Sequence, residues 1–140
     1  MKLYSFYRSS LLLVLTAFYF TAAMAVSDWI EIGTKRAGVS AKSVIFHIHQ
    51  ARSFEKIRFK ISDGDLQLRD TKLYFSDKKV RREGLQRKIA KDSYSRSIPI
   101  DASQDRHLVK VEVFYTKPQQ STPETEAHIS LMAMPARNPN

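Results

Sequence analysis

The alternation of apolar and charged residues between Phe54 and Ser62 constrains the fold more than any other feature of this chain. In the middle of the segment the alternating residues are Lys56, Ile57, Arg58, Phe59, Lys60 and Ile61. Successive side chains of a β-strand point to opposite faces, whereas a helix repeats about every 3.6 residues. The segment is therefore predicted to be a strand with one face in the core and one face in water.

The same period recurs along most of the chain, and it predicts seven or eight short strands. The other alternating segments are residues 29–32, 43–49, 66–68, 73–75, 98–100, 108–115 and 127–133. This pattern predicts an all-β fold. We expect an antiparallel β-sandwich of the jelly-roll kind, with a small closed β-barrel as the alternative.

Two breaks in the alternation are informative. Asp63 and Gly64 form a turn signal, because this pair tolerates the positive φ of a tight hairpin. The apolar positions then change parity between Leu68 and Leu73. An extra residue in a strand has this effect, so the sequence predicts a bulge or a break at residues 69–71.

Residues 78–96 are predicted to form a long basic loop. Val80, Leu85 and Ile89 have a loosely helical spacing, but Gly84 interrupts them, so we expect at most one helical turn. Farther on, residues 98–100 contain a proline, which cannot donate to a sheet and suits only an edge or the start of a strand.

The first 25 residues have the organisation of a cleavable secretory signal peptide. Lys2 and Arg8 are followed by an apolar run at residues 11–20, and residues 23–25 read Ala-Met-Ala, which predicts cleavage after Ala25. An uncleaved anchor is the alternative, but the apolar stretch of residues 11–26 is shorter than the roughly 20 residues of a spanning helix. We expect a periplasmic or secreted bacterial protein whose processed form does not span the membrane.

Removing the 25 residues of this leader from the 140 leaves 115, which is the size of one domain. Residues 26–140 are therefore expected to form a single β-sandwich, with a polar loop at residues 117–126 and a disordered tail at residues 135–140. The chain has no cysteine. Disulfides, thiolate zinc sites, cysteine nucleophiles and lipid acylation of a cysteine are all excluded.

Positive charge is concentrated in the basic segment, residues 78–96. Its cations are Lys78, Lys79, Arg81, Arg82, Arg87, Lys88, Lys91 and Arg96, against two acids, Glu83 and Asp92. Such a cluster attracts anions, and Tyr94 adds an aromatic ring beside it. Export argues against nucleic acid and favours anionic lipids or acidic glycans of the envelope. The alternative is a solvated loop that only keeps the protein soluble.

His47 and His49 are the candidates for metal binding. On a strand their side chains would share a face about 7 Å apart, as half of a metal site requires. A third ligand such as His107 or His128 would have to come from a neighbouring strand. The alternative is a pair of solvent-facing histidines, and we expect neither a bound metal nor another cofactor.

Other candidate sites have weaker support. Asp63, Asp65 and Asp70 could hold calcium, although the calcium-loop signature is absent. No nucleophile elbow, zinc-protease motif, phosphate loop or dinucleotide fingerprint occurs, so no catalytic residue is expected. Trp29 is the only tryptophan and, at the start of a strand, is expected in the core.

Five segments together resemble a family of small exported bacterial proteins described only as a domain of unknown function. These segments are residues 54–61, 64–68, 72–75, 98–101 and 110–113. The resemblance covers roughly residues 29–131 and implies a signal peptide followed by a compact β-sandwich. It implies no activity and no catalytic residues.

Three functions are compatible with the sequence. The first is a non-catalytic binding or envelope accessory protein that attracts anions through the basic segment. The second is an adhesive protein that pairs an exposed strand edge near Ile98 with a partner. The third is a metal-assisted enzyme built on His47 and His49.

Overall fold

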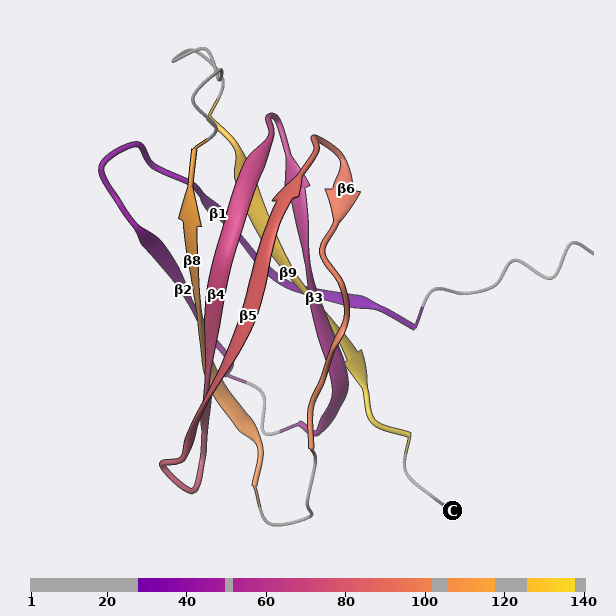
Figure 1. Ribbon diagram of the computed structural model, residues 1–140. Helices are drawn as coiled ribbons and strands as arrows, with labels where there is room; N and C mark the ends of the chain where they lie inside the picture. The colour runs from indigo at the N-terminus through magenta and orange to yellow at the C-terminus, as the bar shows by residue number, and fades with distance from the viewer. Residues whose placement is uncertain (1–27, 50–51, 102–105, 118–125, 138–140) are drawn as a thin grey trace, which may run out of the picture.

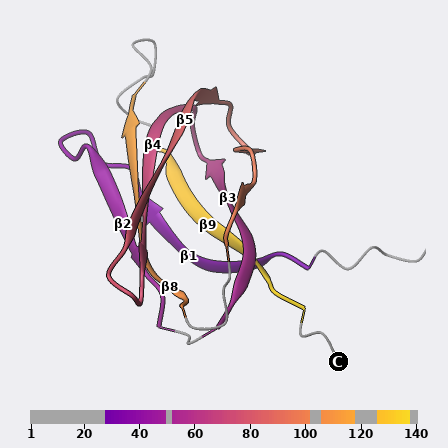
Figure 2. The same cartoon turned by 60° about the horizontal axis from the view of Figure 1, so that its bottom comes forward.

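The computed structural model describes residues 28–49, 52–101, 106–117 and 126–137. Within these ranges nine β-strands form two antiparallel sheets, and no helix occurs (Figure 1). Figure 2 shows the sheets as two facing layers. Each sheet has its own strand order, so the fold is a sandwich and not a closed barrel, as the alternation predicted.

Sheet A has the order β1-β9-β3-β6, with β7 also pairing with β3. Its strands are β1 (Ile30–Arg36), β9 (His128–Pro135), β3 (Phe54–Ser62), β6 (Ser93–Tyr94) and β7 (Ile98–Pro99). The two short strands β6 and β7 pair with opposite halves of β3. Ser95 joins them, because its N–H donates to Phe59 O at 2.8 Å and its Oγ accepts from Phe59 N at 2.9 Å.

Sheet B has the order β2-β8-β4-β5. Its strands are β2 (Ser43–His47), β8 (Leu108–Thr116), β4 (Leu66–Phe75) and β5 (Val80–Ile89). When β6 and β7 are counted as one broken strand, the two orders are those of a jelly roll, in which the chain crosses repeatedly between sheets.

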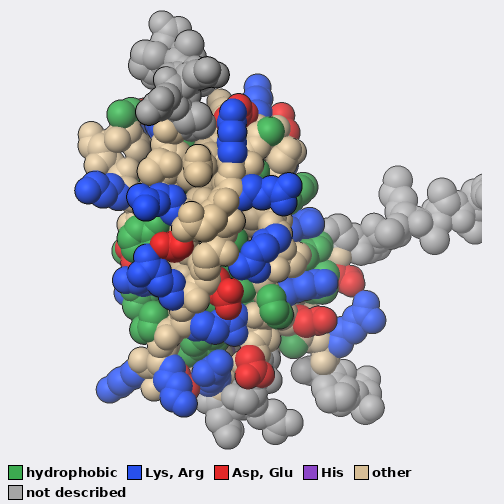
Figure 3. Space-filling model, viewed as in Figure 1, with side chains coloured by type: hydrophobic (Ala, Val, Ile, Leu, Met, Phe, Trp, Pro, Cys, Tyr) green, Lys and Arg blue, Asp and Glu red, His purple; other side chains and the backbone are tan. Residues whose placement is uncertain are grey.

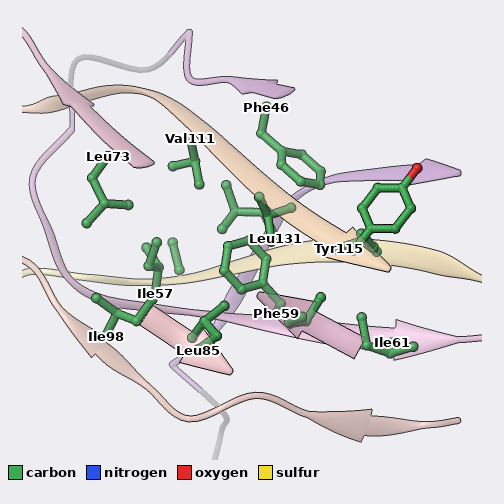
Figure 4. Packing of buried hydrophobic residues seen from close by; sticks show 14 of the residues in the cluster. Phe46, Ile57, Phe59, Ile61, Leu73, Leu85, Ile98, Val111, Tyr115 and Leu131 are labelled. Atoms are coloured by element: carbon green, nitrogen blue, oxygen red, sulfur yellow. The ribbon is translucent and has the colours of Figure 1, made fainter. Parts of the chain in front are cut away.

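The core lies between the two inner faces, where side chains from both sheets point toward one another (Figure 4). Phe59 of β3, Leu131 of β9, Leu73 of β4 and Val111 of β8 are fully buried. Burying a side chain of this size contributes about 1.5–3 kcal/mol. Apolar burial therefore provides the cohesion of a chain without disulfides.

The prediction of a basic loop at residues 78–96 is wrong, because most of that segment is β5 and β6. Leu85 and Ile89 are both buried, and their spacing of four is also two periods of a strand. The alternation of apolar and polar residues is not visible in the sequence of β5, because two of the positions that face sheet A are the charged residues Arg81 and Glu83. At the edge of the sheet these charged side chains extend past the core toward the edge of sheet A, and both stay partly exposed.

The turn at Asp63 and Gly64 is present, but it is not a hairpin. The left-handed residue is Asp63, with φ 64°. The turn connects β3 of sheet A to β4 of sheet B, so the strands on either side of it do not pair. The strands that do form a hairpin are β4 and β5, across a turn in which Lys78 has φ 67°.

Two of the predicted irregularities are confirmed. The register of β4 shifts between Leu68 and Thr71 against β8, where the parity change predicted a bulge. Pro99 lies in a strand at the edge of sheet A, as its missing N–H requires.

Two predicted element ends are wrong. The first strand does not stop at Gly33, since β1 continues to Arg36 through a register shift. The tail does not begin at Pro135, which is the last residue of β9, and the next residue, Ala136, donates its N–H to Ser53 O at 3.0 Å.

The signal peptide, with its cleavage site at Ala25, and residues 138–140 lie outside the described residues. Among the residues that the structure does describe, no helix is long and apolar enough to cross a membrane.

Candidate functional site

Seven of the eight cations of the basic segment lie along β5 and its two flanks, and the eighth, Arg96, follows β6. A strand rises by about 3.3 Å per residue, so Lys79 before β5 and Lys91 after it are separated by roughly 30–40 Å. Figure 3 shows the face over β4 and β5, where Lys and Arg side chains are scattered from end to end with acidic groups among them. The segment therefore does not gather its charge at one point.

Arg81 and Arg96 connect the edges of the two sheets. Arg81 of β5 donates to the carbonyl oxygen of Pro99 in β7. Arg96, which follows β6, donates to Gly84 O at 2.8 Å and lies 3.5 Å from Glu83 in β5. These two arginines close one side of the sandwich, and they occupy the edge near Ile98 that strand addition by a partner would need.

Two more cations of the segment have acidic partners. Arg82 Nη2 lies 2.5 Å from Asp70 Oδ2, and Lys88 Nζ lies 3.7 Å from Asp65 Oδ2. Within the described residues no ion pair involves the other four, which are Lys78, Lys79, Arg87 and Lys91. Half of the predicted anion-binding set is thus engaged within the fold.

A second basic surface, which we call the Arg58 face, lies on the outer side of sheet A. The guanidinium of Arg58 on β3 sits between two aromatic rings, 4.2 Å from the ring centre of Trp29 and 4.0 Å from that of Tyr94. Lys56 lies 5.8 Å from the Trp29 ring, and Lys60 lies 5.8 Å from the Tyr94 ring. Cations and aromatic faces attract at these distances.

The Arg58 face carries unneutralised charge. In the part of the chain that the structure describes, no carboxylate lies within ion-pair distance of Lys56, Arg58 or Lys60. Met132 and Met134 of β9 pair with Arg58 and Lys56 and lie half-buried on the same side. The result is a surface of three cations interleaved with aromatic and thioether groups.

The prediction that Trp29 belongs to the core is wrong, because Trp29 is half-buried outside the sandwich. The sequence offered one signal for the Arg58 face, the alternating cations of β3. Trp29 and Tyr94 come from distant parts of the chain, and only the pairing of β1, β9, β3 and β6 brings them together.

A third basic feature, the bulge cleft, lies on the outer side of sheet B. The irregularity in β4 leaves two consecutive residues, Arg69 and Asp70, outside the core beside Phe114 of β8. Lys42 and Arg82 complete the charged rim of an open cleft of about 300 Å³. The Arg82 guanidinium, which donates to Asp70, holds the pKa of that carboxyl below its usual range.

The histidine pair is placed as the strand period predicted. The rings of His47 and His49 lie on one exposed side with their centres 6.3 Å apart. Of the two suggested third ligands, His128 lies in sheet A, where its Nδ1 is 2.8 Å from Asp63 Oδ2. The described residues contain no group of three potential metal ligands.

The three aspartates considered for calcium do not converge. Asp65 accepts the N–H of Lys91 at 2.8 Å, Asp63 contacts His128, and Asp70 lies in the bulge cleft. Each has a partner within the protein, so their oxygens are not arranged around a common point.

A family model described as a domain of unknown function, DUF2541, matches residues 9–133. The matched range contains β1 to β8 and most of β9. This confirms the resemblance to a domain-of-unknown-function family, and the description of that family assigns no activity. No curated protein matches the chain.

Proposed function

The chain belongs to the DUF2541 family, and we propose that it is an exported, non-catalytic accessory protein of the bacterial envelope that docks on anionic lipid surfaces. The observation that supports this proposal is the Arg58 face. Three cations that form no ion pair with any described carboxylate lie there with two aromatic rings, on one side of sheet A.

The composition of the Arg58 face suits a lipid headgroup layer. Trp and Tyr are the side chains enriched where membranes meet water, because each has an apolar body and a polar end. Lys side chains can bury their stems while the ammonium stays in water. Each Lys or Arg near an anionic bilayer adds about 1 kcal/mol of attraction.

The geometry favours lipid over a stacked sugar or base. A ligand ring that stacks between two aromatic side chains needs the space between them to be open. Here Arg58 fills that space, with both rings close to its guanidinium. The aromatic groups therefore hold a cation in position and leave no slot for a planar ligand.

Export and the absence of catalysis are parts of the same proposal. The signal-peptide pattern of residues 1–25 supports export. The absence of a catalytic motif from the sequence supports a binding role. An envelope protein whose charged face opposes anionic headgroups would be held at the membrane surface without a lipid anchor.

The export part is tested by expression of the full chain in a bacterium, followed by fractionation and mass spectrometry. The expected product is a periplasmic or secreted protein that has lost residues 1–25. An intact chain in the cytoplasm would overturn this part.

The docking part is tested with that processed protein and vesicles of phosphatidylglycerol or phosphatidylcholine. Trp29 is the sole tryptophan and lies in the Arg58 face, so its emission reports directly on docking. We expect a blue shift with phosphatidylglycerol alone, which is lost in high salt because the attraction is screened.

Two matched double variants locate the docking site. Lys56→Gln with Lys60→Gln should lower the affinity for phosphatidylglycerol vesicles by at least about tenfold. Lys79→Gln with Arg87→Gln removes the same charge from the basic segment and should have a much smaller effect. Equal losses in the two variants, or retention on heparin without vesicle binding, would contradict lipid docking by the Arg58 face.

A further inference from the structure

We propose that the bulge cleft on sheet B is a binding site for a phosphate monoester, with the phosphate held by Lys42, Arg69 and Arg82 and the organic group lying against Phe114. The site is separate from the Arg58 face, which is on the other sheet. The ligand is also different, since the cleft, although open to solvent, has a volume of about 300 Å³ that suits one small molecule.

The irregularity in β4 creates this cleft. Leu68 and Thr71 are both fully buried, so two residues lie between consecutive core positions where a regular strand would have one. Opposite them β8 supplies a single residue, Phe114. Bulges often direct side chains into functional sites, and here the bulge brings Arg69 and Asp70 to the same rim.

The charge of the rim suits a dianion. Lys42, Arg69 and Arg82 are positive and Asp70 is negative, which leaves two positive charges in excess. A phosphate monoester carries about −1.5 to −2 at neutral pH. Arginine also presents a planar set of donors that matches phosphate oxygens, so two arginines on one rim favour phosphate over a monoanion.

Phe114 gives the cleft an apolar wall. Its ring is half-buried in β8, and the ammonium of Lys72 lies 5.5 Å from its centre. A volume of about 300 Å³ is at the lower end of the range for small-molecule sites. An organic group of the size of one ring could lie on Phe114 while its phosphate reaches the rim.

Asp70 lowers the affinity of the cleft for phosphate, because it competes for Arg82. It accepts from Arg82 and lies 3.4 Å from Gln86 Nε2, so part of the donor capacity of the rim is used in the unliganded protein. The bonded Arg82 stabilises the charged carboxylate, in agreement with its lowered pKa. A phosphate has to compete with this carboxylate for Arg82.

The test is a titration of the purified protein with phenyl phosphate, followed by the NMR resonances of Phe114 and Thr116. We expect saturable shifts at the cleft and at least tenfold weaker binding of inorganic phosphate, which lacks the ring. Arg69→Gln and Arg82→Gln should each weaken phenyl phosphate binding about tenfold. Asp70→Asn should strengthen it about threefold, because Arg82 is released.

Lys35→Gln is the matched control, since it removes one positive charge from β1 of the other sheet. We expect no more than a twofold change in this variant. If Arg82→Gln and Lys35→Gln have the same effect, or if Asp70→Asn weakens binding, the cleft is not the site.

Two further ligands identify the source of the phosphate. Dioctanoyl phosphatidic acid, below its micellar concentration, carries the group on a lipid, and glycerol phosphate carries it on a soluble molecule. Tighter binding of the lipid indicates a headgroup ligand, equal binding indicates a soluble phosphate monoester, and binding of neither would overturn the proposal. The titration contains no vesicles, so a protein that fails to dock on vesicles would still show the shifts at the cleft. The two proposals can therefore fail independently.

Discussion

β3 and β5 are both strongly basic strands, but they use their charges in opposite ways. β3 lies inside sheet A, between β9 and the broken β6–β7 strand, and its outward cations have no carboxylate partner in the described residues. β5 is the edge of sheet B, and Arg81 and Arg82 on it contact Pro99 and Asp70. The number of charges in a segment therefore does not show how many are available to a ligand.

The difference follows from position in the sheet. The backbone N–H and C=O groups of an interior strand pair with strands on both sides. Its outward side chains are therefore not needed as hydrogen-bond partners for exposed backbone groups. An edge strand has unpaired backbone and a neighbouring sheet edge close by, and charged side chains commonly cover such an edge. Three predictions, in order of decreasing effect, test this contrast.

The largest effect is expected in the core positions of the two strands. Phe59→Ala in β3 should lower the free energy of unfolding by about 3–5 kcal/mol, because Phe59 is fully buried between the sheets. Leu85→Ala in β5 should cost about 2 kcal/mol, since β5 is the edge strand of sheet B and this side chain keeps 9% of its surface exposed. Urea unfolding followed by circular dichroism measures the free energy of unfolding of both variants. Equal losses of stability would contradict the difference between the interior strand and the edge strand.

An intermediate effect is expected when the sheet-edge arginines are removed. Arg81→Gln with Arg96→Gln should destabilise the protein by about 2 kcal/mol, because charged donors to Pro99 O and Gly84 O are lost. Lys56→Gln with Lys60→Gln should change stability by no more than about 0.5 kcal/mol. Thermal unfolding of the two double variants is the measurement, and a larger loss in the β3 variant would reverse the comparison.

The smallest effect concerns the ion pair between Arg82 and Asp70. The pKa of Asp70 is lowered in the folded protein, so its contribution to stability is present above the usual carboxyl pKa and is lost as the pH falls through the lowered value. Asp70→Asn should therefore be less stable than the unchanged protein near pH 6, and the two should converge as the pH falls through the lowered pKa of Asp70. A stability difference that grew in acid would show the opposite shift.

The same contrast explains which parts of the fold could be predicted from the sequence. β3 was predicted with its observed ends, because its alternation is unbroken from Lys56 to Ser62, and only Phe54, which lies before a register shift, is out of phase. β5 was missed because charged residues take up several of its inward positions. The bulge in β4 was predicted from parity, since only an added residue reverses the faces of a strand.

The two proposed binding surfaces could be predicted from the sequence only in fragments. The cations of β3 and the irregularity at residues 69–71 are visible along the chain, but their partners are not local. Arg58 meets Trp29 and Tyr94, and Arg69 meets Phe114, only after the jelly-roll crossings are complete. The spacing of residues along the sequence cannot predict such contacts, because only the order of the strands in the sheets brings these residues together.

The strand order also governs when this chain can fold. The last two strands, β8 and β9, occupy interior places in the sheets, where β9 separates β1 from β3 and β8 separates β2 from β4. A chain that emerges from its N-terminus, through a ribosome or a membrane channel, cannot complete either sheet until these final strands follow. Such a topology delays the folding of both sheets until β8 and β9 have emerged.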